Sequence, residues 1–422
     1  MKKTVKVLLT PVHTSLMFCL MSVLVGLVDM ASDLYVPVLP EIGRVFQVSE
    51  SWVGATISIN LISLALSGLF YGSLSDSIGR KPVIIGGLSL FIVSSFACGF
   101  STNVYELLVA RFFQGLGGGV AFSVGVAVVR DLYEGGAKGA QMYSRMQSVI
   151  ALSPAFAPII GGIIGTIYGW AWIFYTLSII ALVLFIAILF FGKETLPPQQ
   201  RHKKYSIDFA QKYQYLLSRP IFLCYAGVQI LSLGWFWSEL AFFPALFQDH
   251  YGIAADSFGI YLGILMLAYI LGTFINQYVV HRVCLKKLVW IGIMLFFFSA
   301  FAMSAAQYLN FISPWIIVAL RFPAGIGFAL LFGNAGTLAI DQETEHTGSA
   351  SALIGASELL AGAICIFIIE MFEAVTIYPL SLIIIGSSAL CVWLMTKAKN
   401  LEKESGVNQN TYSSMKQDIL FK

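Results

Sequence analysis

Long apolar runs separated by short polar breaks cover most of the chain. The runs reach roughly 20 residues, the length that an α-helix needs to cross about 30 Å of hydrocarbon. They do not alternate between apolar and polar residues over about ten positions, as the strands of a membrane barrel do. The pattern therefore predicts twelve membrane-spanning helices, at residues 14–40, 52–75, 82–101, 105–129, 142–167, 170–191, 220–247, 257–280, 286–306, 314–339, 347–372 and 376–396.

Composition and charge support a membrane protein. Hydrophobic residues make up 58% of the chain and charged residues 11%, against about a quarter charged in soluble proteins. With both termini in the cytoplasm, all but three of the 25 Lys and Arg residues lie in cytoplasmic segments or at the cytoplasmic ends of spans; the exceptions are Arg44 outside, and Arg111 and Arg321 within spans. This asymmetry follows the positive-inside rule, so the net charge of +3 reflects topology and gives no reason to expect a nucleic acid partner.

The chain divides into two similar halves. The longest internal polar stretch, 192–219, is expected to be a cytoplasmic linker between an amino-terminal six-helix bundle (1–191) and a carboxy-terminal one (220–396). A polar cytoplasmic tail without ordered structure is expected at 397–422. The sequence Arg-Phe-Phe-Gln-Gly-Leu-Gly at 111–117 reappears as Arg-Phe-Pro-Ala-Gly-Ile-Gly 210 residues later, again opening a span that enters from outside. Repeats of this kind predict an all-α transporter with pseudo-two-fold symmetry and a site at the membrane midplane.

Four motifs resemble those of the major facilitator superfamily. Residues 72–82, Gly-Ser-Leu-Ser-Asp-Ser-Ile-Gly-Arg-Lys-Pro, match the signature of its loop between helices 2 and 3 completely. Arg111-x-x-Gln114-Gly115 resembles its fourth-helix motif, and Ala-Pro-Ile-Ile-Gly-Gly at 157–162 resembles its antiporter motif. Residues 33–40, Asp-Leu-Tyr-Val-Pro-Val-Leu-Pro, are similar to the first-helix pattern of the Bcr/CflA branch of drug/proton antiporters.

This resemblance implies a proton-coupled antiporter of the bacterial inner membrane that exports small organic or amphipathic compounds, such as drugs, by alternating access. It implies protons as the coupling ion, no cofactor or metal, and small molecules, protons and the lipid bilayer as partners; we expect a monomer. The alternatives are a dedicated metabolite transporter of the same fold (a siderophore or organic acid exporter, or an importer) and, less favoured, a channel or membrane enzyme. The histidines lie near helix ends or in loops, which argues against a His-based enzyme site at membrane depth.

Three charges in the first half are the candidates for proton coupling. A rise of about 1.5 Å per residue places Asp33 roughly 10 Å, Asp29 roughly 16 Å and Arg111 roughly 9 Å below the outer edge. In the family the first and fourth helices line the central cavity, so the matching depths of Asp33 and Arg111 predict a direct or water-bridged pair. Two carboxylates on one helix face repel when both are ionised, so Asp33, with Asp29, can bind the coupling proton. The competing interpretation is a structural ion pair.

Further candidates for the cavity come from both halves. Glu239 follows Trp235 and Trp237 in the seventh span, where a carboxylate beside aromatic rings could hold an amphipathic cation. The alternative is a carboxylate that reaches outer water or a structural partner. Glu358, near the middle of the eleventh span, and Arg321 are cavity or interhelical residues. The motif residues Tyr35 and Gln114 complete the set.

A second group of residues is expected to control conformation. Asp76 can cap a helix terminus, and Arg80 and Lys81 can pair with Asp131 beyond the fourth span. The resemblance implies that such contacts hold the bundles together on the cytoplasmic side in the outward-open state, while the alternative is a plain topology anchor. The fifth span is expected to be kinked and tightly packed because of its prolines and glycines. The residues assigned to gating are Gly72, Asp76, Gly79, Arg80, Lys81, Asp131, Pro158, Gly161 and Gly162.

Overall fold

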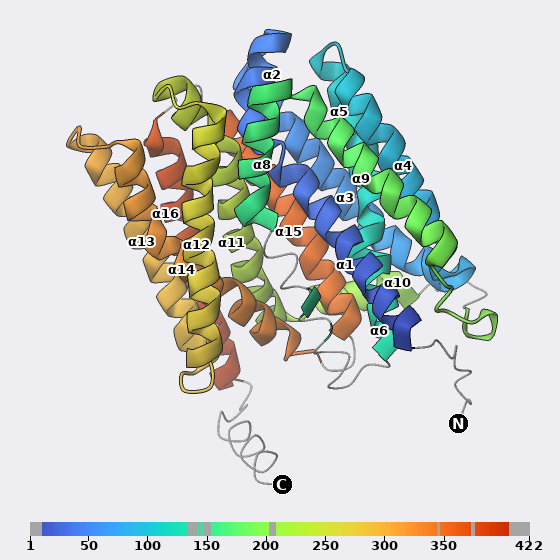
Figure 1. Ribbon diagram of the computed structural model, residues 1–422. Helices are drawn as coiled ribbons and strands as arrows, with labels where there is room; N and C mark the ends of the chain where they lie inside the picture. Colours follow the sequence, from blue (N-terminus) through green and yellow to red (C-terminus); the bar gives the residue numbers. More distant parts are fainter. Residues whose placement is uncertain are drawn as a thin grey trace.

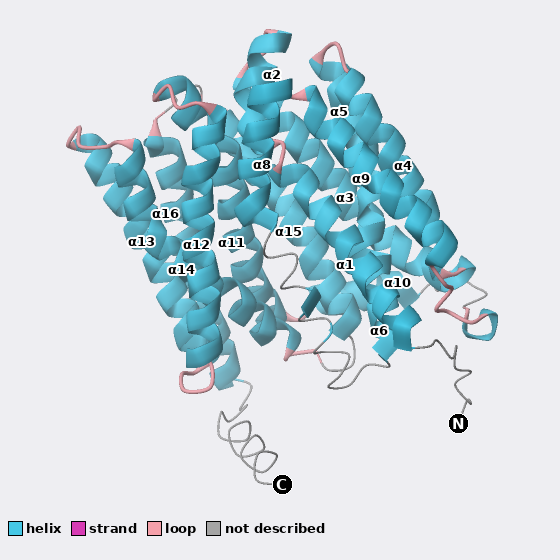
Figure 2. Cartoon of the chain, in the orientation of Figure 1, coloured by secondary structure: helices cyan, strands magenta, loops and turns pink. Residues whose placement is uncertain are grey.

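Helices are the only regular secondary structure among the described residues, and short loops connect them (Figure 2). The computed structural model describes residues 11–133, 142, 145–146, 153–201, 208–343, 347–372 and 376–404. The first half contains α1 (Pro11–Asp33), η1 (Val36–Val38), α2 (Leu39–Phe46), α3 (Glu50–Ile78), α4 (Arg80–Phe100), α5 (Val104–Val120), the π-helical turn η2 (Ala121–Gly125), α6 (Val126–Tyr133), α8 (Ser153–Tyr168) and α9 (Ala171–Phe191). The second half contains η3 (Pro198–Gln200), α10 (Asp208–Leu217), α11 (Pro220–Pro244), the π-helical turn η4 (Ala245–His250), α12 (Ala255–Val279), α13 (Leu285–Tyr308), α14 (Pro314–Ile340), α15 (Thr347–Glu370) and α16 (Ile377–Glu404).

Within the described residues, 11 helical segments are long and apolar enough to cross a membrane. They correspond to eleven of the twelve predicted spans. The remaining predicted span, 142–167, overlaps α8, which has 16 residues, and most of the residues before α8 lie outside the described ranges. The all-α membrane fold is confirmed, and the count of twelve spans is confirmed only in part.

The first span is not the single continuous helix that the apolar run at 14–40 predicts. Helix α1 ends at Asp33, and a short 3-10 turn at Val36–Val38 leads into α2. Pro37 and Pro40 follow closely, and proline removes a backbone donor and disfavours the helical conformation of the residue before it. The break leaves Asp33 at a helix terminus, in the middle of the first segment that crosses the membrane.

The repeat extends beyond the arginine motif to the caps of the helices that carry it. Asn103 precedes α5 and accepts a hydrogen bond of 3.0 Å from the backbone N–H of Glu106. Ser313, 210 residues later, caps α14 in the same way through the N–H of Ile316 at 3.4 Å. Short polar side chains at this position satisfy donors that the first helical turn leaves free. The two halves therefore start these helices with the same local device.

The two halves contact each other mainly through two helix pairs, α3 with α15 and α8 with α12, and less extensively where η1 meets α11 and α12 and where α2 meets η4. Ser58 in α3 donates to the carbonyl oxygen of Ala363 in α15 at 3.2 Å. At Gly162 in α8 a Cβ would overlap the backbone of Ala255 in α12. In the predicted topology these contacts lie in the outer parts of the spans. Figure 1 shows the start of α1 and the end of α16 at the opposite, lower end of the molecule.

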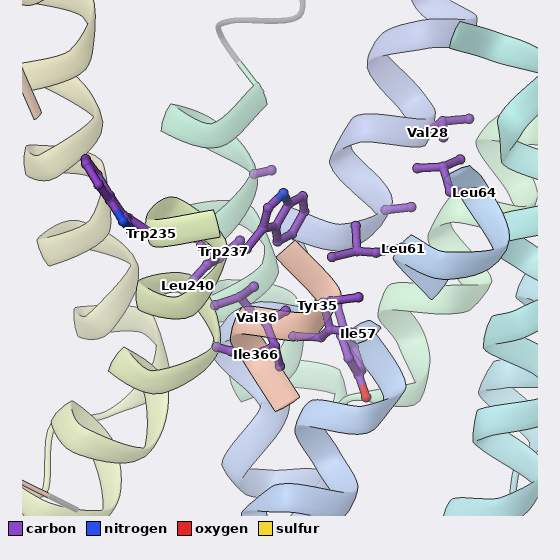
Figure 3. Packing of buried hydrophobic residues seen from close by; sticks show 14 of the residues in the cluster. Val28, Tyr35, Val36, Ile57, Leu61, Leu64, Trp235, Trp237, Leu240 and Ile366 are labelled. Carbon is purple, nitrogen blue, oxygen red and sulfur yellow. The ribbon is translucent and has the colours of Figure 1, made fainter. Parts of the chain in front are cut away.

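The buried apolar core continues from one half into the other (Figure 3). Tyr35 and Ile57 contribute to it from the first half, and Trp237, Leu240 and Ile366 from the second. The core thus surrounds the break in the first span with apolar side chains, and any ionisable group near that break is shielded from solvent.

Two polar segments differ from expectation. Residues 192–219, predicted as a linker, contain helix α10 and a glutamate that contacts α4, described below. Helix α16 continues to Glu404, so the first residues of the predicted tail 397–422 are helical rather than without structure. Glu402 holds this end, because it accepts hydrogen bonds from the Tyr225 hydroxyl at 2.7 Å and from Lys286 Nζ at 2.5 Å. Residues 405–422 lie outside the described ranges.

Candidate functional site

Asp29 and Asp33 lie together where helices of both halves meet. Asp33 is 3% exposed, and its carboxylate accepts a hydrogen bond of 3.1 Å from the hydroxyl of Ser153, the first residue of α8. The same hydroxyl is within reach of Asp29, one helical turn earlier, and Tyr269 of α12 in the second half lies within electrostatic range of Asp29. Among the described residues, no Lys or Arg forms an ion pair with either carboxylate. The predicted proximity of the two acids is confirmed; Asp33 is buried and Asp29 is half-buried.

The direct pair predicted between Asp33 and Arg111 is wrong. Arg111 is fully buried, but its Nη1 donates to Gln114 at 2.7 Å and its Nε to the carbonyl oxygen of Thr56 at 3.3 Å. The ring of Tyr35 lies 4.8 Å from the guanidinium carbon. Because α1 ends at Asp33, the chain turns and presents Tyr35, rather than the carboxylate, to the guanidinium.

Tyr35 and Gln114 are therefore close neighbours of Arg111. The Tyr35 hydroxyl shares a hydrogen bond of 2.8 Å with Thr56, which fixes the ring beside the guanidinium. The Gln114 amide donates to Ser95 at 2.8 Å, so its oxygen remains directed at Arg111. Arg111 Nη2 has no hydrogen-bond partner within the described part of the chain. This half thus contains a buried cation, Arg111, and two carboxylates, the buried Asp33 and the half-buried Asp29, that do not neutralise it directly.

In the second half the corresponding charges form a closed pair. Glu239 in α11 accepts a hydrogen bond of 2.6 Å from Arg321 Nε, and Arg321 Nη2 forms an ion pair with the same oxygen. Residue exposures of 9% for Glu239 and 5% for Arg321 show that the pair is buried. The sequence analysis named both residues as candidates but did not predict that they form a pair. The depth argument could have done so, because Arg321 is seven residues into α14 and Glu239 is at a similar depth in α11.

The tryptophans do not form an aromatic surface around Glu239. Trp235 is fully buried, hydrogen-bonds Ser387 through its indole N–H and packs on Phe296 at 4.4 Å. Trp237 points away from it, as Figure 3 shows, and lies against Gly362 of α15. The predicted grouping of Trp235 and Trp237 with Glu239 as a cation site is therefore corrected. Residues two positions apart on a helix point about 200° away from each other, so Trp235 and Trp237 face different neighbours.

Glu358 is a separate buried acid between α15 and α11. It is 9% exposed, Gln229 of α11 is within reach of its carboxylate, and one carboxylate oxygen has no hydrogen-bond partner among the described residues. The placement agrees with the expected interhelical or cavity position. No interaction recorded for the described residues joins Glu358 to Asp29, Asp33 or Glu239.

The charged turn between α3 and α4 forms the predicted network in part. Arg80 pairs with Asp76 at 2.6 Å and with Asp131 at 3.0 Å, which confirms the contact beyond the fourth span. Lys81 instead donates to the carbonyl oxygen of Leu189 at 2.9 Å. Gly79, with φ of 109°, adopts a conformation that glycine tolerates best. All of these partners lie in the first half, so in this conformation the turn binds that half together.

The predicted role of Asp76 as a helix cap is wrong, because Glu194 caps α4. Glu194 accepts hydrogen bonds from the backbone N–H groups of Arg80 at 2.9 Å and Lys81 at 3.2 Å. A carboxylate at this position accepts hydrogen bonds from backbone N–H groups that the first helical turn leaves free. It is also stabilised by the positive end of the helix dipole. Arg201 lies 3.6 Å from Glu194 and holds it from the other side. No local signal reveals this contact, since Glu194 follows α9 and lies more than a hundred residues from α4.

Helix α8 confirms the expected tight packing of the fifth span. It continues through Pro158, and Gly161 abuts the backbone of Leu34, next to Asp33. On the other side, Gly259 of α12 lies against the Pro158 carbonyl oxygen. The tight approach of α8 to both α1 and α12 positions Ser153 on the acid pair. Gly72, also assigned to gating, faces the Ser123 hydroxyl of η2.

The comparison with known proteins agrees with this architecture. The profile of the Major Facilitator Superfamily matches residues 21–364 and 228–417. The chain belongs to this superfamily. A protein of Bacillus subtilis (strain 168), named uncharacterized MFS-type transporter YdgK, is 30% identical over 337 residues, which cover 79% of this chain and 83% of that protein.

Two further similarities extend over most of the chain. Multidrug resistance protein MdtL of Shewanella oneidensis is 26% identical over 363 residues, covering 86% of this chain and 90% of the relative. The structure of the xylose transporter XylE from E. coli, in a partially occluded inward-open conformation, matches with a TM-score of 0.72 at 15% identity. That match covers 92% of this chain and 98% of XylE, and it supports the fold alone. The protein is thus a multi-pass membrane transporter of the major facilitator fold.

Proposed function

We propose that the protein is a proton-coupled antiporter that exports small amphipathic organic compounds, including drugs, from the cytoplasm by alternating access. The observation that carries the proposal is the pair of the half-buried Asp29 and the buried Asp33 beside Ser153, where α8 packs against both α1 and α12. A carboxylate inside the membrane without a cationic partner is costly, and binding a proton removes its charge. Since the pair lies between the halves, a change in its charge acts on their contact.

Relatives and motifs support efflux as the direction. Relatives that cover most of the chain are named multidrug resistance proteins. The stretch 157–162 resembles the antiporter motif, and its glycines hold α8 tightly against α1 and α12. Protons moving inward down their gradient would occupy the acids, and substrate leaving the cytoplasm would displace them. We expect both termini on the cytoplasmic side and a monomer that needs no cofactor.

The contacts between the halves fit a cycle of alternating access. The pairs α3–α15 and α8–α12 are closed in the outer parts of the spans, as expected of the inward-facing part of such a cycle. Opening the outer side would separate α8 from α12 and expose Asp29 and Asp33 to external protons. Chemical labelling of cysteines placed on both faces would report the exchange.

The experiment that tests the proposal is transport by the purified chain in proteoliposomes with an imposed pH gradient. Ethidium, chloramphenicol and a catechol chelator serve as cationic, neutral and metal-chelating substrates. We expect a proton gradient to drive uptake into vesicles of the inside-out fraction for more than one of these compounds. Transport of the chelator alone would support the dedicated metabolite exporter, and gradient-independent transport of all three would overturn proton coupling.

A further inference from the structure

A small cavity lies inside the second half, next to the buried pair of Glu239 and Arg321. Its volume is about 40 Å³, enough for a water molecule or a small substituent of a substrate rather than for a ring. Helices α11, α12, α13 and α14 all contribute to its wall. The polar residues of the wall are Glu239, Tyr269 and Arg321, and apolar or aromatic side chains form the remainder.

Arg321, which lines this cavity, has a donor without a hydrogen-bond partner among the described residues. Its Nε and Nη2 are occupied by Glu239, and one face of the guanidinium lies over the ring of Phe296 at 4.6 Å. Its Nη1 is buried and has no hydrogen-bond partner within the described residues. A buried donor without a hydrogen-bond partner costs free energy, so a group that accepts a hydrogen bond from it is favoured at this position.

The charge balance at the cavity decides which group fits. Glu239 is already neutralised by Arg321, so the carboxylate has no net attraction left for an organic cation. The free group is a donor, which selects an acceptor such as a carbonyl, ether or carboxylate oxygen. Of the two interpretations that the sequence left open for Glu239, the pairing agrees with a structural partner and not with a receptor for cations.

Aromatic side chains form much of the cavity wall, so a substituent that enters the cavity lies against aromatic rings. Phe328 lies between Phe236, which is stacked on it at 5.8 Å, and Tyr269 at 5.4 Å. Tyr269 also lies within electrostatic range of Asp29 of the other half, and its helix α12 packs against α8 of the first half, so the cavity lies close to the contact between the halves. A compound that reaches between the halves can thus place an acceptor group beside Arg321.

We propose that this cavity is a specificity subsite for neutral or weakly acidic aromatic compounds, whose acceptor group binds Nη1 of Arg321 while Glu239 serves as the counter-ion. The inference rests on the proposed function, because it names the substrate class of the same transporter. It assigns Arg321 as a binding residue and Glu239 as a positioning residue. It predicts selection by hydrogen-bonding type and charge, whereas the acids of the first half provide coupling.

The test is equilibrium binding to the purified full chain in lipid nanodiscs, without any proton gradient. The probes share one ring system: 2-naphthamide has a neutral acceptor, 2-naphthoate an anionic one, and 2-naphthylmethylammonium is a cation without an acceptor. We expect the amide to bind at least about tenfold more tightly than the ammonium compound. Equal binding, or preference for the ammonium compound, would overturn the proposal.

Two variants of the pair are expected to change the affinity for the probes in opposite directions. Glu239→Gln leaves the guanidinium without its counter-ion, so the affinity for 2-naphthoate should rise about tenfold or more. The double variant Glu239→Leu/Arg321→Met keeps the site neutral and leaves no hydrogen-bond donor at either position, so 2-naphthamide should lose about tenfold in affinity. Arg282→Gln, at an exposed position between α12 and α13, is the matched control and should leave the ranking unchanged. An unchanged probe ranking in Glu239→Gln would refute the subsite, since a misfolded protein would not retain it.

Asp33→Asn separates this inference from the proposed function. It should abolish gradient-driven export but keep the ranking of the three naphthyl probes. If the wild-type protein shows no proton coupling yet ranks the probes as expected, the subsite stands and the antiport proposal fails. If coupling is present but the ranking is absent, only the subsite is overturned.

Discussion

Arg321 donates a hydrogen bond of 2.6 Å to Glu239, whereas Arg111, at the equivalent position in the first half, has no carboxylate partner among the described residues. The two arginines begin the same motif and both lie over an aromatic ring, Phe296 and Tyr35. The second half therefore contains a neutral ion pair, whereas in the first half the cation, Arg111, lies apart from the two neighbouring acids. This asymmetry favours a division of labour in which the first half titrates and the second half selects.

The closed pair should be strongly coupled in stability. Arg321→Gln leaves Glu239 buried without a counter-charge, which should cost about 3–5 kcal/mol of unfolding free energy if the acid stays ionised. The double variant with Glu239→Gln should recover most of that loss, because both charges are gone. Unfolding in mixed micelles, followed by tryptophan fluorescence, measures both. Additive losses in the double variant would contradict a direct interaction.

Asp33→Asn should abolish the dependence of transport on the pH gradient, because the amide cannot exchange a proton at the Ser153 contact. The protein should still reach the membrane, since Asn keeps the size and can accept the same hydrogen bond. Asp29→Asn should weaken the dependence less, because Ser153 contacts Asp33 directly. Gradient-driven and counterflow transport in proteoliposomes distinguish the effects. Undiminished antiport by Asp33→Asn would refute its coupling role.

The spans could be predicted from the sequence because the length of an apolar run directly reflects the thickness of the membrane. The depth of a residue along a helix could be predicted in the same way. Depth succeeds for Glu239 and Arg321, which lie at similar depths and do meet. It fails for Asp33 and Arg111, because equal depth does not fix the direction in which a side chain points. The break of α1 before Tyr35 changes that direction, and it was visible only as two prolines.

Contacts between distant segments could not be predicted. Glu194 reaches α4 only after the last helix of the first half has returned to the cytoplasmic turn, so its partners depend on the whole bundle. The expected cap, Asp76, lies near in sequence, but its carboxylate is used by Arg80 one helical turn later. Local propensity gave a plausible cap, and tertiary packing supplied a different one.

Glu194→Ala should destabilise the start of α4. The change removes acceptors from two backbone donors and the partner of Arg201, so we expect a loss of about 1–2 kcal/mol in unfolding free energy. Hydrogen exchange at Arg80 and Lys81 should accelerate, while exchange near the far end of α4 should not. Glu194→Gln keeps an acceptor and should retain about half of the stability. Unaltered exchange at the two amides would exclude the cap.

Arg80→Ala should change the rate of the conformational cycle more than the affinity for substrate. The side chain joins Asp76 and Asp131 at the end of α3 and the end of α6, far from the acid pair in the predicted topology. Arg80→Lys, which keeps one charge but cannot contact both acids in the same geometry, should restore the rate only in part. Maximal transport rate and equilibrium binding of the same compound separate the two effects. A defect confined to affinity would argue against gating.

Gly161→Ala should disturb coupling through packing alone. A Cβ at this position would overlap the backbone of Leu34, so α8 must move away from α1 and carry Ser153 away from Asp33. Overpacking of this kind costs about 1–3 kcal/mol. Gly86→Ala in α4, where a Cβ meets no atom within 4 Å, is the matched control and should be neutral or slightly stabilising. Transport by Gly161→Ala should need a steeper pH gradient than transport by Gly86→Ala at equal expression. Neither change adds or removes a charge. A difference confined to Gly161→Ala would therefore show that proton coupling depends on the distance between α8 and the end of α1. Equal behaviour of the two variants would show that coupling does not depend on that contact.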